Sequence, residues 1–247
     1  MTDNKQIHKC DLGGLYKSKP MSYAEWESEI RSKIKSGMTV LDAGAGEGKA
    51  VRLINHVDNA IYIGIDNGVG CDDWDYSKVL KLDLYDLNEF ENEKFDVVFL
   101  FQVLEHLDNP EKALSEICRV TKSNGHVFIS VPLSQSIHQV PHDYYRYTPY
   151  GLRVILRRHG FEMLWISPQL YGEFQASLRR LQWSLSYLCE CNALSKVIYR
   201  PFSLLVRLIE KIAPKYDSKL SIHAHPIGYF ACFEKLIHEM DDERARQ

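Results

Sequence analysis

The sequence lacks the features that define several classes of protein. Neither sign of charge dominates, since 30 Lys and Arg residues stand against 33 Asp and Glu residues, and this balance gives no global electrostatic case for binding nucleic acid. The unbroken apolar runs fall far short of the ~20 residues that a membrane-spanning helix needs. We find no internal repeat, and a 45% apolar content excludes disordered and collagen-like chains. We therefore expect a folded chain with one large core that does not span a membrane.

Cysteine is scarce and scattered. The six cysteines lack the paired two-residue spacing of tetrahedral zinc sites, and no segment resembling a signal peptide precedes them. Cys189 and Cys191 form the only cluster, which offers two metal ligands at most, and we interpret them as buried free thiols. These observations exclude a disulfide scaffold and predict reduced thiols in a cytoplasmic protein.

Short apolar runs alternate with longer amphipathic ones along much of the chain. A helix is expected to begin at Ser22, whose hydroxyl is placed to cap it with Glu25 three positions on, and to end before Gly37. The clearest further elements are strands at Thr39–Ala43, Ala60–Ile65, Lys78–Leu82, Phe95–Phe101 and His126–Val131, and helices at Glu47–His56 and Pro110–Thr121. Strands separated by helices imply an α/β fold with a mostly parallel sheet.

The last third of the chain departs from this alternation. A helix near Pro149–His159 and a strand at Phe161–Ser167 continue it, and a last strand is expected at Ile227–Phe233. Between these two strands, residues 171–223 have apolar positions at helical spacing and predict a helical insertion. The insertion holds eight Lys or Arg residues against four Asp or Glu residues, a net charge of +4.

The most informative segment is Val40–Gly48, an apolar strand that runs into a glycine-rich turn. Glycines allow positive φ and let a ligand approach the backbone closely. The spacing does not fit the dinucleotide motif G-x-G-x-x-G, because Lys49 stands at the third glycine position. It does not fit the Walker motif either, because Ala43 and Ala50 stand where that motif needs glycine and Ser or Thr. The alternative to a ligand-binding loop is a tight turn without a ligand.

Acidic residues follow two of the expected strands. Asp66 closes the second strand 20 residues after Gly46, where a carboxylate accepts hydrogen bonds from both hydroxyls of an adenosine ribose. Asp83 follows the third strand and is a candidate to accept from an adenine amino group. The loop Gln102–Leu107 follows the fourth strand and should border the switch point of the sheet, where open α/β folds bind ligands.

In this order and spacing, the chain resembles a class I S-adenosylmethionine-dependent methyltransferase (methyltransferase type 11-like) over about residues 20–170. The segments that carry the resemblance are Asp42–Gly46, Ile63–Asp66, Asp83 with Leu84, Phe95–Val98 leading to Leu104–His106, and Gly125–Ile129. The resemblance implies a Rossmann-like sheet of seven strands in the order 3-2-1-4-5-7-6, the last one antiparallel. Residues 1–170 and 224–247 would form this domain, and 171–223 would cap its acceptor site.

The resemblance also assigns a cofactor site. S-adenosylmethionine would bind, and S-adenosylhomocysteine would be released. Asp42 would orient the methionine end through the glycine loop, and the Gln102 region would close over it. The residues so assigned are Asp42, Gly44, Ala45, Gly46, Asp66, Asn67, Asp83, Leu84, Gln102 and Val103. The link from Asp66 to Lys78 departs from the family, because it is too short for a full helix.

A second unusual string follows the fifth strand, where His138–Pro149 is rich in His, Tyr, Asp and Arg. His142 and Asp143 are candidates for a general base that takes a proton from a hydroxyl acceptor, and His142 is the best of them. Tyr145 is a further catalytic candidate, placed to hold an acceptor ring. His106 is the other candidate base, at the rim of the expected cofactor pocket. The alternative is that the tyrosines cover the sheet edge and His142 is an exposed loop residue.

We expect a cytoplasmic methyltransferase that O-methylates a small molecule, a glycan or a lipid-linked intermediate. The alternatives are a nucleotide-dependent oxidoreductase on the same fold and a non-catalytic, cofactor-binding partner subunit. No metal is expected, although Glu105, His106 and His142 form one conceivable set of ligands. The apolar surface and charge of residues 171–223 leave peripheral contact with an anionic membrane as an alternative to a simple cap.

Overall fold

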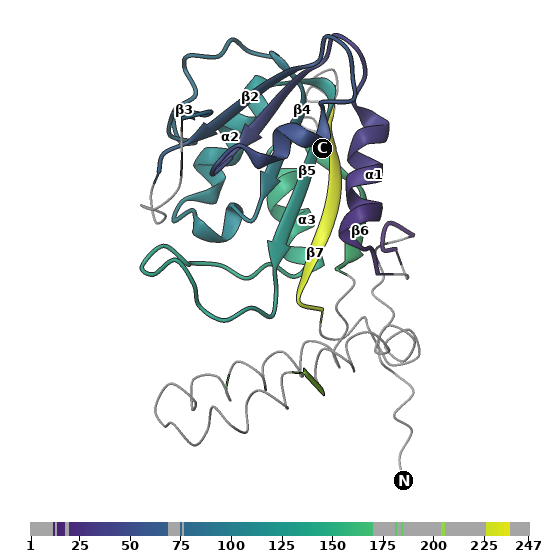
Figure 1. Cartoon of the computed structure of the whole chain (residues 1–247), viewed down its shortest axis with the longest axis vertical. Coiled ribbons are helices and arrows are strands. Elements are labelled where there is room, and N and C mark those ends of the chain that lie inside the picture. Colours follow the sequence, from purple (N-terminus) through teal and green to yellow (C-terminus); the bar gives the residue numbers. More distant parts are fainter. Residues whose placement is uncertain are drawn as a thin grey trace, which may run out of the picture.

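Seven strands form one sheet in the computed structural model, which describes residues 12, 14–17, 20–68, 75, 77–169, 181, 184, 204, 205 and 226–237. The strands are β1 (Thr39–Ala43), β2 (Ile61–Asp66), β3 (Leu80–Lys81), β4 (Phe95–Phe101), β5 (Thr121–Pro132), β6 (Phe161–Pro168) and β7 (Gly228–Lys235). Their order is β3-β2-β1-β4-β5-β7-β6, and only β7 runs antiparallel to its neighbours in this sheet (Figure 1). The predicted fold class and strand order are confirmed.

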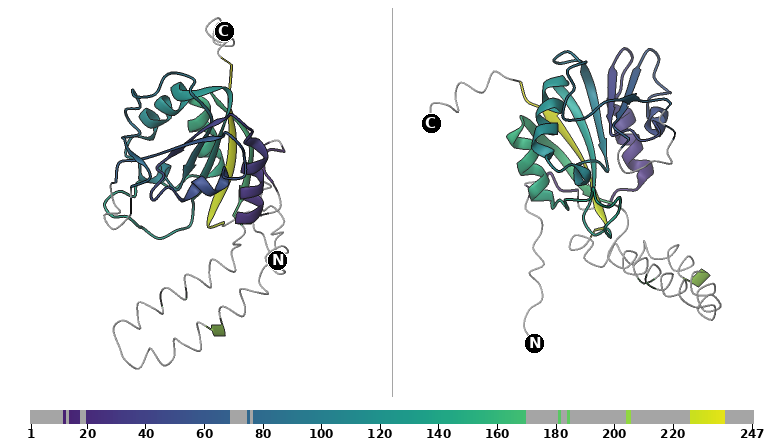
Figure 2. Two further views of the ribbon diagram at one scale, coloured as in Figure 1. Left: turned by 45° about the horizontal axis from the view of Figure 1, so that its top comes forward. Right: turned by 90° about the vertical axis from the view of Figure 1, so that its left-hand side faces the viewer.

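Helices cover both faces of the sheet (Figure 2). They are α1 (Tyr23–Lys33), α2 (Pro110–Val120) and α3 (Pro149–Arg158), with the short 3-10 helices η1 (Lys49–Leu53) and η2 (Leu104–His106). Side chains of β4 alternate between the two faces, as a strand covered on both sides requires. Val97 and Phe99 pack in a cluster with α1 and η1, whereas Val98 and Leu100 pack in a larger cluster with α2 and α3.

Helix α1 begins as the sequence predicts. The Ser22 hydroxyl accepts a hydrogen bond from the Glu25 backbone N–H at 3.2 Å, and the Ser22 N–H donates to the Glu25 carboxylate at 2.8 Å. This capping box satisfies N–H groups that have no partner inside the helix. It positions Trp26 on the sheet, where its ring stacks on Phe230 with centroids 4.7 Å apart.

The prediction of a helix over Glu47–His56 is wrong. The structure has only the 3-10 helix η1 there, and Gly48 precedes it with a φ of 70° and no side-chain cap. Missing capping and the β-branched side chains of Val51 and Ile54 both lower helix stability, which accounts for the short element. Strand β3 is likewise reduced to two residues, whereas β5 begins five residues before its predicted start, at Thr121.

The predicted insertion lies outside the described residues, apart from positions 181, 184, 204 and 205. The division into a domain and an acceptor-site cap therefore stays a prediction. Among the described residues, no helix combines the length and the apolar character needed to cross a bilayer. Cys118 and Cys232, in the described part of the chain, carry free thiols as expected.

Candidate active site

A cavity of about 520 Å³ lies at the carboxyl ends of β1, β2 and β4, where the strand order reverses. The predicted cofactor residues that line it are Gly44, Asp66, Asn67, Asp83, Leu84, Gln102 and Val103. The predicted catalytic residues that line it are His106 and His142. The predicted site residues that are not part of its lining are Asp42, Ala45, Gly46, Asp143 and Tyr145. One cavity thus joins the glycine loop to the histidine-rich string.

The glycine loop turns sharply after β1 and packs against the loop that follows β4. Backbone N–H groups of Gly44 and Ala45 both donate to the Ile65 carbonyl at 2.9 Å, which ties the loop to β2. Gly44 has a φ of 78°, and a Cβ atom there would lie 2.5 Å from Cγ2 of Val103. Glycine is required at this position both by the backbone conformation and by the close approach of Val103.

Asp66 connects the end of β2 to the glycine loop. Its carboxylate accepts hydrogen bonds from the Gly46 N–H at 2.9 Å and from the Gly68 N–H at 2.7 Å. A carboxylate offers about four acceptor sites, so these two bonds leave further sites. Because Asp66 also lines the cavity, those sites are placed to accept from a hydroxyl-bearing ligand.

Asp42 lies beneath the loop rather than in the cavity wall. Its side chain is buried and accepts a short hydrogen bond from the Tyr62 hydroxyl. Burial raises the pKa of Asp42 to about 6, against the hydrogen bond from Tyr62, and the nearby charge of Asp66 raises it further. Asp42 is therefore placed to act on the cavity through the loop rather than by lining it.

Gln102 stands at the end of β4 in a conformation that side chains seldom adopt. Its φ is 56°, and its backbone N–H donates to the Ser130 carbonyl at 2.9 Å. Its side-chain amide donates to the Ser130 hydroxyl at 3.2 Å. Such left-handed backbone at a non-glycine residue costs of order 1–3 kcal/mol and persists where neighbouring structure holds it, commonly at functional sites.

A tyrosine and an aspartate that no motif identified also line the cavity. The Tyr85 hydroxyl donates to the Asp108 carboxylate at 2.5 Å and accepts from the Asn109 N–H at 3.2 Å. Burial and the hydrogen bond to Asp108 raise the pKa of Tyr85 to about 12. The only signal in the sequence was position, since Tyr85 follows β3 and Asp108 follows β4.

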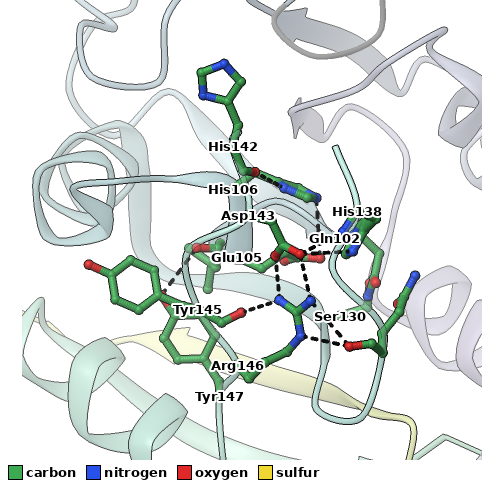
Figure 3. A network of polar contacts seen from close by, with 12 residues as sticks. Gln102, Glu105, His106, Ser130, His138, His142, Asp143, Tyr145, Arg146 and Tyr147 are labelled. Atoms are coloured by element: carbon green, nitrogen blue, oxygen red, sulfur yellow. Dashed lines mark hydrogen bonds and ion pairs between the residues drawn. The ribbon is translucent and has the colours of Figure 1, made fainter. Parts of the chain in front are cut away.

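The histidine-rich string lines the other side of the cavity with His138, His142 and Tyr144. Figure 3 shows His138 and His142 together with His106. His106 Nδ1 donates to the His142 carbonyl at 2.5 Å, and His142 Nδ1 lies 3.2 Å from the Tyr144 hydroxyl. Because a carbonyl only accepts, Nδ1 of His106 carries the proton, and Nε2 is the basic atom. Burial lowers the pKa of His106 and so favours its neutral form.

Asp143 is a candidate proton acceptor in the sequence, but in the structure other groups of the loop bond its carboxylate. The Arg146 guanidinium donates to both of its carboxylate oxygens, at 2.5 and 2.8 Å, and the His138 N–H donates to one of them at 2.9 Å. These partners, with Arg146 contributing most, hold the pKa of Asp143 well below its usual range. Asp143 therefore stays charged and shapes the loop.

Tyr145 also serves the loop rather than the cavity. Its hydroxyl donates to the Asp108 carbonyl at 3.3 Å, and its backbone N–H donates to the Glu105 carbonyl at 3.2 Å. Tyr144, next to it, does line the cavity. The sequence pattern did not indicate which tyrosine of the string lines the cavity.

Known proteins share this fold and sequence pattern. A family model described as a methyltransferase domain matches residues 22–165. The (S)-coclaurine N-methyltransferase of Papaver somniferum is 31% identical over 109 residues, and the match spans 40% of this chain but only 31% of that protein.

Solved structures agree in fold. A SAM-dependent methyltransferase from Archaeoglobus fulgidus superposes with a TM-score of 0.55 at 21% identity, covering 85% of this chain and 92% of that one. The [4+2]-cyclase SpnF superposes with a TM-score of 0.54 at 18% identity, covering 85% of this chain and 80% of that one. At these identities the similarity shows the fold alone.

Proposed function

The chain belongs to the methyltransferase domain family, and from that premise we propose that it transfers the methyl group of S-adenosylmethionine to a hydroxyl group. The acceptor is a small molecule, a glycan or a lipid-linked intermediate. One observation carries the proposal: a single cavity is bordered by the glycine loop with Asp66 on one side and by His106 and His142 on the other.

The residues on the β1–β2 side fit the cofactor. Gly44 leaves room that a Cβ atom would fill, and Asp66 keeps acceptor sites for ribose hydroxyls. Asp83 and Leu84 extend the same wall toward the adenine position, while Gln102 and Val103 close it near β4. When bound, S-adenosylmethionine supplies an electrophilic methyl group on a sulfonium, and in-line displacement then depends chiefly on positioning.

A histidine is the base that this site offers. As the acceptor oxygen bonds to the methyl carbon and the carbon–sulfur bond breaks, the hydroxyl proton must go to an acceptor group. His142 is our first choice and His106 the second, because both line the cavity. Asp143 is not proposed for this role, since its carboxylate is engaged by Arg146.

Transfer to nitrogen is the second candidate function. It is favoured by the match to an N-methyltransferase among the curated relatives. A neutral amine attacks with its own lone pair and needs no base in the displacement step, so the two candidates differ in their dependence on histidine. A mass increase of one methyl group on hydroxyl or amine acceptors separates them.

Calorimetry tests the cofactor half of the proposal. We expect micromolar binding of S-adenosylmethionine or S-adenosylhomocysteine by the full chain, abolished in Asp66→Ala. Asp58→Ala, which removes an exposed carboxylate, is the matched control and should bind as the unchanged protein does. Failure of both ligands to bind the unchanged protein would eliminate the proposal.

Two other functions have their own tests. Fluorescence enhancement of NADH on mixing would favour an oxidoreductase. A cofactor-bound protein that never adds a methyl group to any acceptor would favour a non-catalytic subunit or a different reaction, and SpnF shows that this fold also occurs in a cyclase.

A further inference from the structure

Glu105 is a buried carboxylate without a hydrogen-bond partner among the described residues. Its side chain is completely inaccessible to solvent, and neither carboxylate oxygen accepts a hydrogen bond there. Its backbone is well fixed, since its carbonyl accepts from the N–H groups of Tyr144 at 2.8 Å and Tyr145 at 3.2 Å. Burying an ionised carboxylate in this way is costly, and burial raises the pKa of Glu105 to about 8. A cation bonded to the side chain would stabilise its charged form instead.

Two histidines stand beside that carboxylate. His106 Nε2 lies 3.9 Å from Oε1 of Glu105, and the rings of His106 and His138 have centroids 4.8 Å apart with their planes at 83° (Figure 3). One ligand atom from each of the three side chains lies within 4.8 Å of the other two. Two imidazoles and a carboxylate are a donor set that binds divalent first-row transition ions.

Both imidazoles are oriented as metal ligands commonly are. His106 Nδ1 donates to the His142 carbonyl at 2.5 Å, and His138 Nδ1 donates to the Ser136 carbonyl at 3.1 Å. Each bond places the proton on Nδ1 and leaves the lone pair on Nε2, which is the tautomer that binds a metal through Nε2.

The nearby guanidinium does not take the place of such an ion. Arg146 adds positive charge in the vicinity of Glu105, but its hydrogen bonds go to Asp143 and to the carbonyls of Gln135, Ser136 and Tyr145. The guanidinium therefore makes no direct bond to Glu105 that would keep a cation from its oxygens.

We propose that Glu105, His106 and His138 bind one divalent first-row transition metal ion, whose open coordination positions face the cavity. His106 and His138 both line that cavity, so the ion would be reachable by an acceptor. Metal bonds of about 2.0–2.2 Å require the three ligand atoms to move closer together than they stand here, by side-chain rotation. The ion's role rests on the proposed function: it would bind the acceptor oxygen and ease loss of its proton.

Metal titration of the full chain tests this site. Protein stripped with EDTA is titrated with Co²⁺, followed by its visible absorption, and with Zn²⁺, followed by calorimetry. We expect one tightly bound equivalent, and affinity at least ten times weaker in Glu105→Gln and in His138→Asn. His142→Asn is the matched control, because it removes a cavity imidazole outside the cluster, and it should bind within about twofold of the unchanged protein.

The outcomes are distinct. Absence of tight binding, or equal affinity in the unchanged protein and both cluster variants, overturns the site. Loss in His142→Asn with retention in His138→Asn also overturns it and replaces His138 by His142. If Glu105→Gln fails to fold by circular dichroism, His138→Asn still decides. Binding of S-adenosylhomocysteine to the metal-free protein tests the proposed function separately. The metal site can therefore fail while the proposed function stands, and the reverse.

Discussion

Gly44 and Gly37 allow a controlled measurement of what the glycine loop demands. Both have a φ of 78°, but a Cβ atom would meet open space at Gly37 and would lie 2.5 Å from Val103 at Gly44. Gly37→Ala should cost about 1–2 kcal/mol of unfolding free energy, from the backbone conformation alone. Gly44→Ala should cost about 1–3 kcal/mol more, because the alanine overpacks the loop.

Urea unfolding of the two variants gives this comparison. The double variant Gly44→Ala with Val103→Ala should recover part of the additional cost, because it shortens the opposing side chain. Equal losses in Gly37→Ala and Gly44→Ala would show that close approach to Val103 does not constrain the loop.

Asp42 should make stability depend on pH. Its pKa is raised from 3.8 to about 6 by burial, so the native state binds the proton more tightly than the unfolded state does. The contribution of the protonated side chain is therefore fully present below pH 3.8 and is lost as the pH rises through about 6. Relative to Asp42→Asn, the unchanged protein should lose stability between those two values.

Urea unfolding from pH 3.5 to 8 measures that difference. Tyr62→Phe removes a hydrogen bond that favours the charged form of Asp42, so the titration should shift to higher pH in this variant. Parallel stability curves for the unchanged protein and Asp42→Asn would mean that Asp42 ionises equally in both states.

His142 carries the prediction for turnover. If it is the base, His142→Ala should lower turnover by at least about 10²-fold, with the affinity for S-adenosylhomocysteine unchanged, because the imidazole acts on the acceptor side. His56→Ala, which removes an exposed histidine in the turn after η1, is the control and should turn over normally. Unchanged turnover in His142→Ala would remove the need for a histidine base, or would transfer the role to His106 in protein whose His106 Nε2 binds no metal.

At the scale of elements, the capping box of α1 should be worth about 1 kcal/mol. Ser22→Ala removes the hydroxyl that accepts from the Glu25 N–H, and an N-cap loss typically costs 0.5–2 kcal/mol. Ser32→Ala, in the same helix, removes a hydroxyl that donates to the Glu29 carbonyl at 2.7 Å, and it should cost less because it leaves the cap intact. Thermal melting of both variants measures the difference, and equal melting temperatures would contradict the assignment.

Apolar periodicity predicted some helices and strands correctly and others wrongly. Strands β1 and β4 were predicted to the residue, because both are short, largely buried runs of mainly apolar residues, which end before Gly44 and Gln102. The prediction of a helix at 47–56 was wrong, because the spacing of apolar residues carries no information on capping. Gly48 stands at the N-cap position of η1 and has no side chain to cap it. Apolar periodicity indicates which face of an element is buried, whereas a stable helix also needs a residue that caps its first N–H groups.

At the scale of the whole molecule, the family resemblance predicted the order of the strands. The sequence indicated only some of the residues that line the cavity. The glycine loop and Asp66 could be identified from the sequence, because Asp66 ends the expected second strand 20 residues after Gly46. In the structure the Gly46 N–H donates a hydrogen bond to the Asp66 carboxylate. Tyr85 with Asp108, and Glu105 with His138, come together only because loops after β3, β4 and β5 meet at one end of the sheet. The ion pair of Asp143 with Arg146, three residues on, could not be predicted, because it depends on the folded shape of the loop.

The position of β7 in the sheet has a consequence for the order in which the chain can assemble. β7 lies between β5 and β6, so neither of those strands has its full set of partners until residues 228–235 have left the ribosome. Pairing Pro132 with Gly228 closes a long stretch of chain, and such non-local contacts form slowly. Until then, β5 presents an unpaired edge on which a second nascent chain can add a strand. We therefore expect the yield of refolding to fall as protein concentration rises, and to depend less on the stability of any single helix or strand.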